Sequence, residues 1–217
     1  MKTILVASQK GGSGKTTITA HLAVEAGREE NASVFIIDTD KQGTLSLWHE
    51  RREAETPQRA DLPFSRLGDG LKTLAERGAA YCFIDTAPTI SEQNTSLLRL
   101  ADLVLIPVRP SPADLWSVSE TVRLVKESGQ PFLFVITQAK PQATITAQTI
   151  AALSEYGQVA KTFIADRVSY ASAMTGGRTA QELQPKSPAA EEIRGVWIDM
   201  KALFNENNNS IRRAVHG

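Results

Sequence analysis

The segment SQKGGSGKTT, residues 8–17, follows directly on the apolar run ILVA and is the feature that most constrains the fold. Glycines let backbone N–H groups converge on an anion where a Cβ atom would clash. The positive end of the following helix dipole faces the same point. Because a strand-forming run precedes the glycines and a helix-forming run follows them, the segment predicts a phosphate-binding loop. The alternative is a glycine-rich turn with an incidental lysine.

The residue types of this loop suit a nucleoside triphosphate with Mg²⁺. Lys15 is placed to reach the β and γ phosphates, and the hydroxyl of Thr16 is placed to ligate Mg²⁺. We expect the helix to begin near Lys15. The phosphate-binding candidates in the loop are Gly11, Gly12, Ser13, Gly14, Lys15, Thr16 and Thr17.

Composition limits the class of protein. The 217 residues are 41% apolar and 22% charged, which is typical of a soluble globular chain that can bury one core. Lysine plus arginine equals aspartate plus glutamate at 24 each, so any nucleic-acid binding needs a local patch. The single cysteine, Cys82, excludes an intramolecular disulfide. No apolar run approaches the roughly 18 residues of a membrane span. Residues 1–20 carry glycines where a signal peptide needs an apolar core. We therefore predict a cytoplasmic protein without membrane contact.

Short apolar runs alternate with segments of helix length. The runs are nearly continuous in apolar residues, as expected of strands buried on both faces of a parallel sheet. The alternation predicts an α/β fold with a single doubly wound, mostly parallel sheet and helices on both faces. The expected strands are residues 3–7, 34–37, 81–84, 103–108, 132–136 and 159–164, and residues 54–63 are expected to form an exposed loop.

Two later segments show clear helical patterns. In the first, Ser111 can cap the helix, Pro112 suits its first turn, Asp114 completes a capping box, and Gly129 begins the stretch that ends it. The second is the last helix of the domain, for which we favour core docking over membrane binding. Its apolar stripe is Ile193, Val196, Trp197, Met200, Leu203 and Phe204, and that of the first helix is Leu115, Val118, Val122 and Val125.

The loop departs from the common pattern G-x-x-x-x-G-K-[ST], because Gln9 stands in place of the first glycine and Lys10 follows it. It instead resembles the deviant phosphate loop K-G-G-x-G-K-[ST] of the ParA/MinD superfamily of P-loop ATPases. The resemblance implies that Lys10 crosses a dimer interface to the partner's nucleotide phosphates, so that two ATP molecules are held between two subunits. Lys10 thereby joins the phosphate-binding and catalytic candidates. The alternative for Lys10 is a solvated loop lysine.

Three aspartates follow predicted strands, at the edge where α/β sheets bind ligands. The segment DTDKQG is similar to the family's D-x-D-P-Q switch, with Lys41 in place of proline. The resemblance implies that Asp40 orients the attacking water and that Asp38 lies in the outer shell of Mg²⁺. In YCFIDTAP, Asp85 matches the position of the aspartate that holds Mg²⁺, usually through a water.

Further segments bear on the base and on DNA. FVITQAK ends a strand whose following residues often meet the nucleotide base in this family. The chain lacks N-K-x-D, the motif typical of guanine-selective P-loop proteins, so ATP is favoured over GTP. The resemblance implies nonspecific DNA binding by the ATP dimer, although each basic residue alone is an ordinary surface charge. The candidate contacts are Arg167, Arg178, Lys186, Arg194, Arg212 and Arg213.

The resemblance covers nearly the whole chain and is closest to short plasmid-partition ParA proteins. It implies slow hydrolysis of ATP to ADP and phosphate, stimulated by a centromere-binding ParB-like adaptor, in a homodimer that associates with the nucleoid when ATP is bound. We expect an ATPase domain over residues 1–204, which leaves no room for an N-terminal winged helix, and a flexible polar tail over residues 205–217. The alternatives are a MinD-like membrane-associated positioning ATPase and a nucleotide-gated interaction module with little hydrolysis. A small-molecule ligase or synthetase on the same fold also remains open, whereas an iron–sulfur electron-transfer ATPase needs more cysteines than Cys82.

Overall fold

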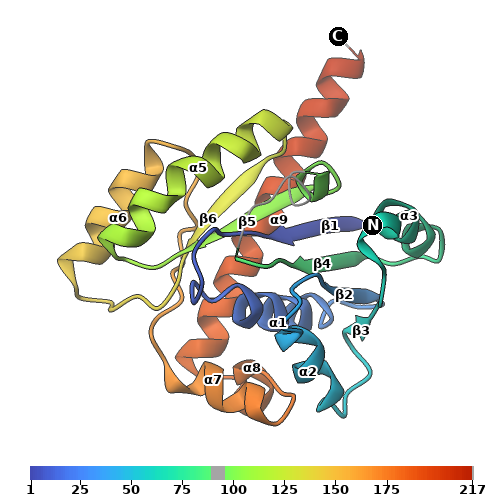
Figure 1. Cartoon of the computed structure of the whole chain (residues 1–217), viewed down its shortest axis with the longest axis horizontal. Helices are drawn as coiled ribbons and strands as arrows, with labels where there is room; N and C mark the ends of the chain where they lie inside the picture. The colour runs from blue at the N-terminus through green and yellow to red at the C-terminus, as the bar shows by residue number, and fades with distance from the viewer. Residues whose placement is uncertain (89–95, 217) are drawn as a thin grey trace.

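A computed structural model describes residues 1–88 and 96–216, with side chains described as far as residue 206. Within these residues, six strands form one sheet in the order β3-β2-β4-β1-β5-β6 (Figure 1). Every neighbouring pair of strands is parallel, which confirms the predicted architecture. The strands are β1 (Lys2–Val6), β2 (Val34–Asp38), β3 (Gln58–Arg59), β4 (Tyr81–Asp85), β5 (Leu103–Val108) and β6 (Phe132–Ile136).

Helices cover both faces of the sheet. One face packs against α1, α2 and α7 to α9, and the other packs against α3, α5 and α6 (Figure 1). The helices are α1 (Lys15–Ala26), α2 (Thr44–Glu50), α3 (Leu67–Glu76, preceded by the 3₁₀ turn Phe64–Arg66), α5 (Pro112–Ser128), α6 (Thr144–Ser154), α7 (Val168–Thr175), α8 (Ala180–Leu183) and α9 (Pro188–His216). Among the described residues, no helix combines the length and the apolar character needed to cross a bilayer.

Alternate residues of each strand belong to two hydrophobic cores, one on each face of the sheet. In β5, Leu103 and Leu105 belong to the core beneath α1 and α9, whereas Val104 and Ile106 belong to the core beneath α5. All four are at most 1% exposed. A strand buried on both faces has no polar face, and this explains why the predicted strands read as continuous apolar runs.

The two predicted helical stripes are confirmed, with one shift. The hydroxyl of Ser111 accepts a hydrogen bond from the Asp114 N–H, and Gly129 caps the far end of α5 at φ 74°. In α5, Leu115 is only half-buried. The buried set of α5 is Asp114, Val118, Thr121, Val122 and Val125, and every residue of the predicted α9 stripe is buried.

Helix α9 continues to His216, so residues 205–216 have helical backbone. The division into an ATPase domain and a flexible tail stays a prediction.

One expectation from the sequence is wrong, and a second holds only in part. Residues 159–164 do not form a strand, although isolated parallel bridges join Phe134 to Val159 and Ala139 to Ala165. The ladder is interrupted because the N–H groups of Lys161 and Thr162 donate to Asp199 on α9 instead. The expected loop over residues 54–63 contains the short edge strand β3, which pairs with β2.

A buried histidine joins α1 to α8. His21 is fully buried; its Nδ1–H donates to the carbonyl of Thr17 at 2.8 Å, and its Nε2 accepts the N–H of Ala180 at 3.1 Å. The bond from Ala180 needs a neutral ring, because Nε2 can accept a hydrogen bond only while it carries no proton. Burial lowers the pKa of His21 to about 4, although the Thr17 carbonyl and nearby Glu182 act to raise it. The contact between the two helices therefore depends on an uncharged ring.

We predict that the link through His21 fails in acid. Because its pKa falls from 6.5 to about 4 on folding, the stability it contributes is present above pH 6.5 and is lost as pH falls toward 4. Compared with a His21→Gln protein, the wild type should lose on the order of 3 kcal/mol more unfolding free energy between pH 7 and pH 4. Urea unfolding of both proteins across this range measures the difference, and parallel profiles would contradict the assignment.

Candidate nucleotide-binding site

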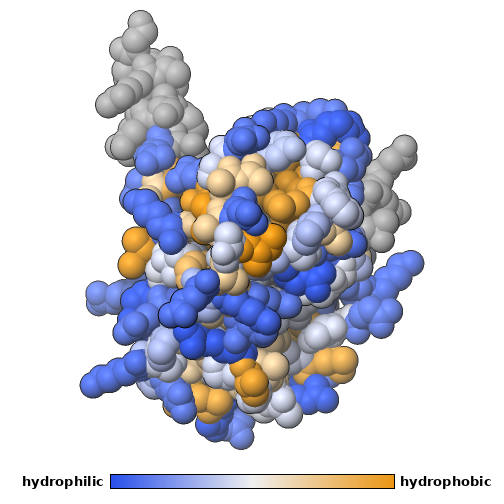
Figure 2. All heavy atoms as spheres, turned by 90° about the vertical axis from the view of Figure 1, so that its left-hand side faces the viewer, coloured by the Kyte–Doolittle hydropathy of each residue, from blue (hydrophilic) through white to orange (hydrophobic). Residues whose placement is uncertain are grey.

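The candidate residues gather at the carboxyl edge of the sheet, where the parallel strands end. In Figure 1 the strands point to the left, and Figure 2 looks onto this edge, where apolar patches alternate with hydrophilic side chains. The loops after β1, β2 and β4 all begin here, since these strands pair in parallel register. The topology thus brings Lys15, Asp38 and Asp85 to one place, as the sequence predicted.

The loop after β1 depends on two glycines with positive φ. Gly12 has φ 74° and Gly14, the N-cap of α1, has φ 86°. Side chains with a Cβ atom rarely adopt this conformation, so glycine is required at both positions. A Cβ atom on Gly14 would lie 3.7 Å from Thr137, an ordinary van der Waals distance, so the requirement at Gly14 comes from its φ and not from lack of space. The turn leads directly into α1, whose first-turn N–H groups have no acceptor within the helix. This confirms the predicted helix start.

Lys15 folds back over its own loop. Its ammonium donates to the carbonyl oxygens of Ser8 at 3.3 Å and Lys10 at 3.1 Å. Burial lowers the pKa of Lys15, whereas the carboxylates of Asp85 and Asp40 act to raise it. An ammonium has three donors, and these two carbonyls use two of them. The third N–H of the ammonium is therefore available to an anion bound by the loop.

Lys10, in the same loop, is less buried than Lys15. It is half-exposed, and among the described residues no carboxylate lies within ion-pair distance of it. Its backbone is fixed, because its N–H donates to the Ser8 hydroxyl and its carbonyl accepts from Lys15. The two lysines thus differ in exposure: Lys15 is buried, and Lys10 is half-exposed.

Asp85 ends β4 beside the first turn of α1. Its Oδ2 accepts a hydrogen bond from the Thr16 hydroxyl at 2.5 Å, whereas its Oδ1 is enclosed without a hydrogen-bond partner among the described residues. Desolvation raises the pKa of Asp85 to about 7, Asp38 adds to the effect, and Thr16 and Lys15 oppose it. The Ser13 hydroxyl is also buried without a partner in the described chain. These polar atoms are enclosed in the protein but incompletely satisfied.

Asp38 and Asp40 shape the loop after β2. Asp38 accepts the N–H groups of Asp40 at 3.0 Å and Ser46 at 2.9 Å, so it fixes both the loop and the start of α2. Asp40 accepts the N–H of Gln42 at 3.0 Å. Both carboxylates retain further acceptor sites. Their positions at this edge agree with the prediction, and their roles toward water and Mg²⁺ stay predictions.

Lys41 stands where the family that the chain resembles has proline, and the turn forms without the proline. The N–H of Gly43 donates to the carbonyl of Asp40 at 3.0 Å, which closes a turn with Lys41 at its second position. Proline is favoured at that position because of its fixed φ. The substitution therefore leaves the turn in place and adds an exposed cation beside the site.

The sequence did not predict an ion pair beside the phosphate-binding loop. The Arg109 guanidinium binds both oxygens of buried Asp114 at 3.0 and 3.1 Å. A Cβ atom on Gly12 would lie 3.5 Å from the same guanidinium. The capping pattern of Asp114 was visible in the sequence, but its long-range position beside the phosphate-binding loop was not.

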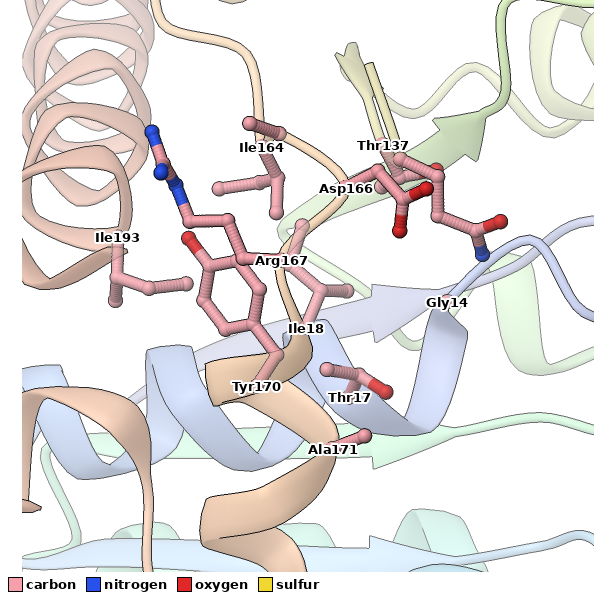
Figure 3. A pocket seen from close by; sticks show the side chains of 12 residues that line it. Gly14, Thr17, Ile18, Thr137, Ile164, Asp166, Arg167, Tyr170, Ala171 and Ile193 are labelled. Atoms are coloured by element: carbon pink, nitrogen blue, oxygen red, sulfur yellow. The ribbon is translucent and has the colours of Figure 1, made fainter. Parts of the chain in front are cut away.

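A cavity of about 190 Å³ opens beside the loop. Figure 3 shows Tyr170 and Ile193 on one side of it, Thr137 and Gly14 on the other, and Thr17 of α1 nearby. Tyr170 is positioned by Glu192, which accepts its hydroxyl at 2.7 Å. The sequence indicated Thr137 only as part of FVITQAK and gave no signal for the tyrosine. The rest of the lining is Ile18, Gln138, Ile164, Ala165, Asp166, Arg167 and Ala171.

A parallel sheet whose central strand β1 enters a buried helix through such a loop is the architecture of the P-loop nucleotide-binding proteins. Residues 4–180 match the protein family described as the CobQ/CobB/MinD/ParA nucleotide binding domain, and the chain belongs to that family. It is a P-loop ATPase of the ParA/MinD superfamily, which confirms the resemblance.

Individual relatives span nearly the whole chain. The chain is 29% identical over 204 residues to the maintenance of carboxysome distribution protein A of Halothiobacillus neapolitanus, covering 89% of this chain and 94% of that protein. It is 25% identical over 226 residues to protein ParA of Rhizobium radiobacter, covering 98% and 100%. The Pyrococcus furiosus cell division ATPase MinD has a TM-score of 0.78 at 18% identity, covering 93% of this chain and 99% of that structure. An ATP complex of McdA from Cyanothece has a TM-score of 0.76 at 22% identity, covering 90% and 95%. These structures confirm the fold.

The proposed DNA contacts are not gathered as free cations. Arg167 pairs with Glu192 at 2.7 Å, Arg194 lies 3.7 Å from Glu25, and Arg178 lies 3.9 Å from Glu53. Lys186 is exposed, and the side chains of Arg212 and Arg213 lie outside the described residues. DNA contact through these residues stays a prediction.

We predict that Asp85 destabilises the protein at neutral and alkaline pH in the absence of nucleotide. Its folded pKa of about 7 exceeds the ordinary 3.8, so its contribution is lost as pH rises from about 4 through 7. Without nucleotide or Mg²⁺, an Asp85→Asn protein should be more stable than wild type at pH 8 by roughly 4 kcal/mol, or about 8–16 °C in Tm. The difference should vanish near pH 4. A variant that melts below wild type at pH 8 would show that the charged carboxylate is already satisfied.

Proposed function

We propose that this chain is a ParA-type partition ATPase: Mg²⁺-ATP drives formation of a sandwich dimer, the dimer binds DNA nonspecifically, and partner-stimulated hydrolysis resets it. Membership of the ParA/MinD superfamily supports ATP as the nucleotide. The observation that supports the proposed dimer is the pair of lysines on one loop. Lys15 is enclosed and serves its own nucleotide, whereas Lys10 is half-exposed and is available to the nucleotide of a second copy.

The residues at the mouth of α1 fit Mg²⁺. Thr16 and Asp85 supply hard oxygen ligands, and Asp85 Oδ1 is enclosed without a partner among the described residues. The described acidic residues do not form a ready-made three-ligand cluster. This suits Mg²⁺, which is usually held by one or two carboxylates together with water and phosphate oxygens. Bound there, the cation would neutralise phosphate charge, and Asp38 would act from its outer shell.

The nucleotide can occupy the loop and the neighbouring cavity together. Gly14 and Thr17 belong to both, so phosphates at the mouth of α1 place the rest of the molecule toward the cavity. Its lining of Ile18, Ile164 and Tyr170 suits the flat apolar faces of a nucleobase. The cavity thus supports a mononucleotide rather than a bare phosphate as the ligand.

Asp40 is the proposed hydrolytic residue. It lies in the turn after β2, where its negative charge acts to raise the pKa of Lys15. The role assigned to it is to orient the attacking water, and the exposed turn that holds it can be adjusted by a partner protein. We therefore expect slow intrinsic turnover and stimulation by a ParB-like adaptor. Assembly on DNA would place the ATP-bound protein on the nucleoid.

We predict that Lys10→Ala abolishes ATP-dependent dimerisation while leaving ADP binding within about threefold of wild type. The residue contributes to the partner's site and not to its own, so its loss removes attraction across the interface. Sedimentation should show monomers without nucleotide and with ADP, dimers of wild type with ATP, and monomers of the variant throughout. Lys72→Ala on α3 controls for the change in net charge. A variant that dimerises as wild type does would contradict the proposal.

The same samples test DNA binding. Retention of wild type on nonspecific duplex DNA should need ATP and fall steeply with salt, because binding releases counterions from phosphates. Retention that persists at high salt, or in Lys10→Ala with ATP, would contradict it.

A second cargo has specific support. The similarity to a carboxysome distribution protein spans 94% of that relative, so the same ATPase cycle can serve a protein compartment in place of a DNA molecule.

Deletion of the gene in its own host separates the two cargoes. Loss of a replicon from growing cells supports DNA partition, whereas stable replicons with clustered protein compartments support compartment positioning. Neither defect would overturn both assignments.

A further inference from the structure

Two side chains at the end of β6 bind successive carbonyls of the phosphate-binding loop. The Thr137 hydroxyl donates to the carbonyl of Ser13 at 2.8 Å. The side-chain amide of Gln138 donates to the carbonyl of Gly12 at 2.7 Å. Thr137 is only 3% exposed, and its own N–H is fixed by β5 through the Val108 carbonyl at 2.9 Å. The donors are therefore mounted on the rigid sheet.

These bonds fix the direction of two N–H groups. In a trans peptide, the carbonyl and the N–H of the same unit point to opposite sides. With the Gly12 and Ser13 carbonyls directed to β6, the N–H groups of Ser13 and Gly14 point away from β6. Neither N–H donates to another described residue. A flip of either peptide would replace a donor with an oxygen that repels an anion.

Gln138 holds an unusual backbone conformation. Its φ is 51°, in the left-handed region, which costs a residue other than glycine free energy that the surroundings must supply. That conformation accompanies a side chain reaching Gly12, although the residue is exposed to solvent. A structural turn at this place would be better served by glycine. The glutamine therefore suggests a role outside the turn itself.

The same two residues line the cavity beside the loop. A group that fills the cavity packs against the side chains that hold the Gly12 and Ser13 carbonyls. We propose that Thr137 and Gln138 are positioning residues, which keep the Ser13 and Gly14 N–H groups aimed at the phosphates and connect occupation of the cavity to phosphate binding. This inference rests on the proposed nucleotide site and deepens it.

The matched test is Thr137→Val against Thr137→Ser. Valine keeps the shape and removes the donor, whereas serine keeps the donor. By calorimetry, Thr137→Val should bind ADP about five- to tenfold more weakly than wild type, as expected for one lost hydrogen bond. It should bind pyrophosphate more weakly by a similar factor, and Thr137→Ser should bind both within about twofold of wild type. Equal affinities for the valine and serine variants would overturn the inference.

Gln138→Gly provides an independent readout, because it relieves the backbone strain while removing the donor. Its Tm without ligand should equal or exceed that of wild type, yet ADP should bind about five- to tenfold more weakly. A residue with only a structural role would change stability and leave affinity unaltered. If the wild type binds neither ADP nor pyrophosphate, the proposed function is overturned. Wild-type binding with unchanged affinity in Thr137→Val and Gln138→Gly would overturn only this inference.

Discussion

The structure depends on one constraint: several backbone N–H groups must stay unpaired and face the same point at the end of a buried strand. Chains normally satisfy their buried N–H groups, so such a loop must be held by its surroundings. Positive φ at Gly12 and Gly14 makes the turn, and burial of β1 on both faces fixes where it begins. The first turn of α1 adds further free donors. The rest of the carboxyl edge supports this arrangement.

Charge at the site is balanced incompletely. Lys15 is buried among carbonyls, Asp85 is buried with one oxygen unused, and the Ser13 hydroxyl is enclosed without a partner in the described chain. Each group lowers the stability of the protein alone, because it is removed from water without full compensation. In the proposed complex, a triphosphate with Mg²⁺ would supply the missing partners to all three. Stability without nucleotide and affinity for nucleotide are thus opposed in the same residues.

The sequence predicted the sheet, both helical stripes and the meeting of Lys15, Asp38 and Asp85, because apolar periodicity and strand ends are local signals. It failed where a distant side chain competes with the backbone, as when Asp199 takes the N–H groups of Lys161 and Thr162. It also missed the support of the loop by Gln138, since a positive φ outside glycine has no local signal. Pairing of Arg167 with Glu192 could not be predicted either. Local pattern therefore places the site, whereas tertiary contacts decide how it is held.

The backbone N–H groups of residues 11–17 are the proposed binding groups for phosphate. The most direct measurement is two-dimensional amide NMR of the ¹⁵N-labelled protein during titration with ADP and Mg²⁺. We expect large shifts for the amides of Ser13, Gly14 and Lys15, together with slowed exchange with solvent. Shifts confined to residues lining the cavity, with these three amides unchanged at saturating ADP, would contradict this assignment.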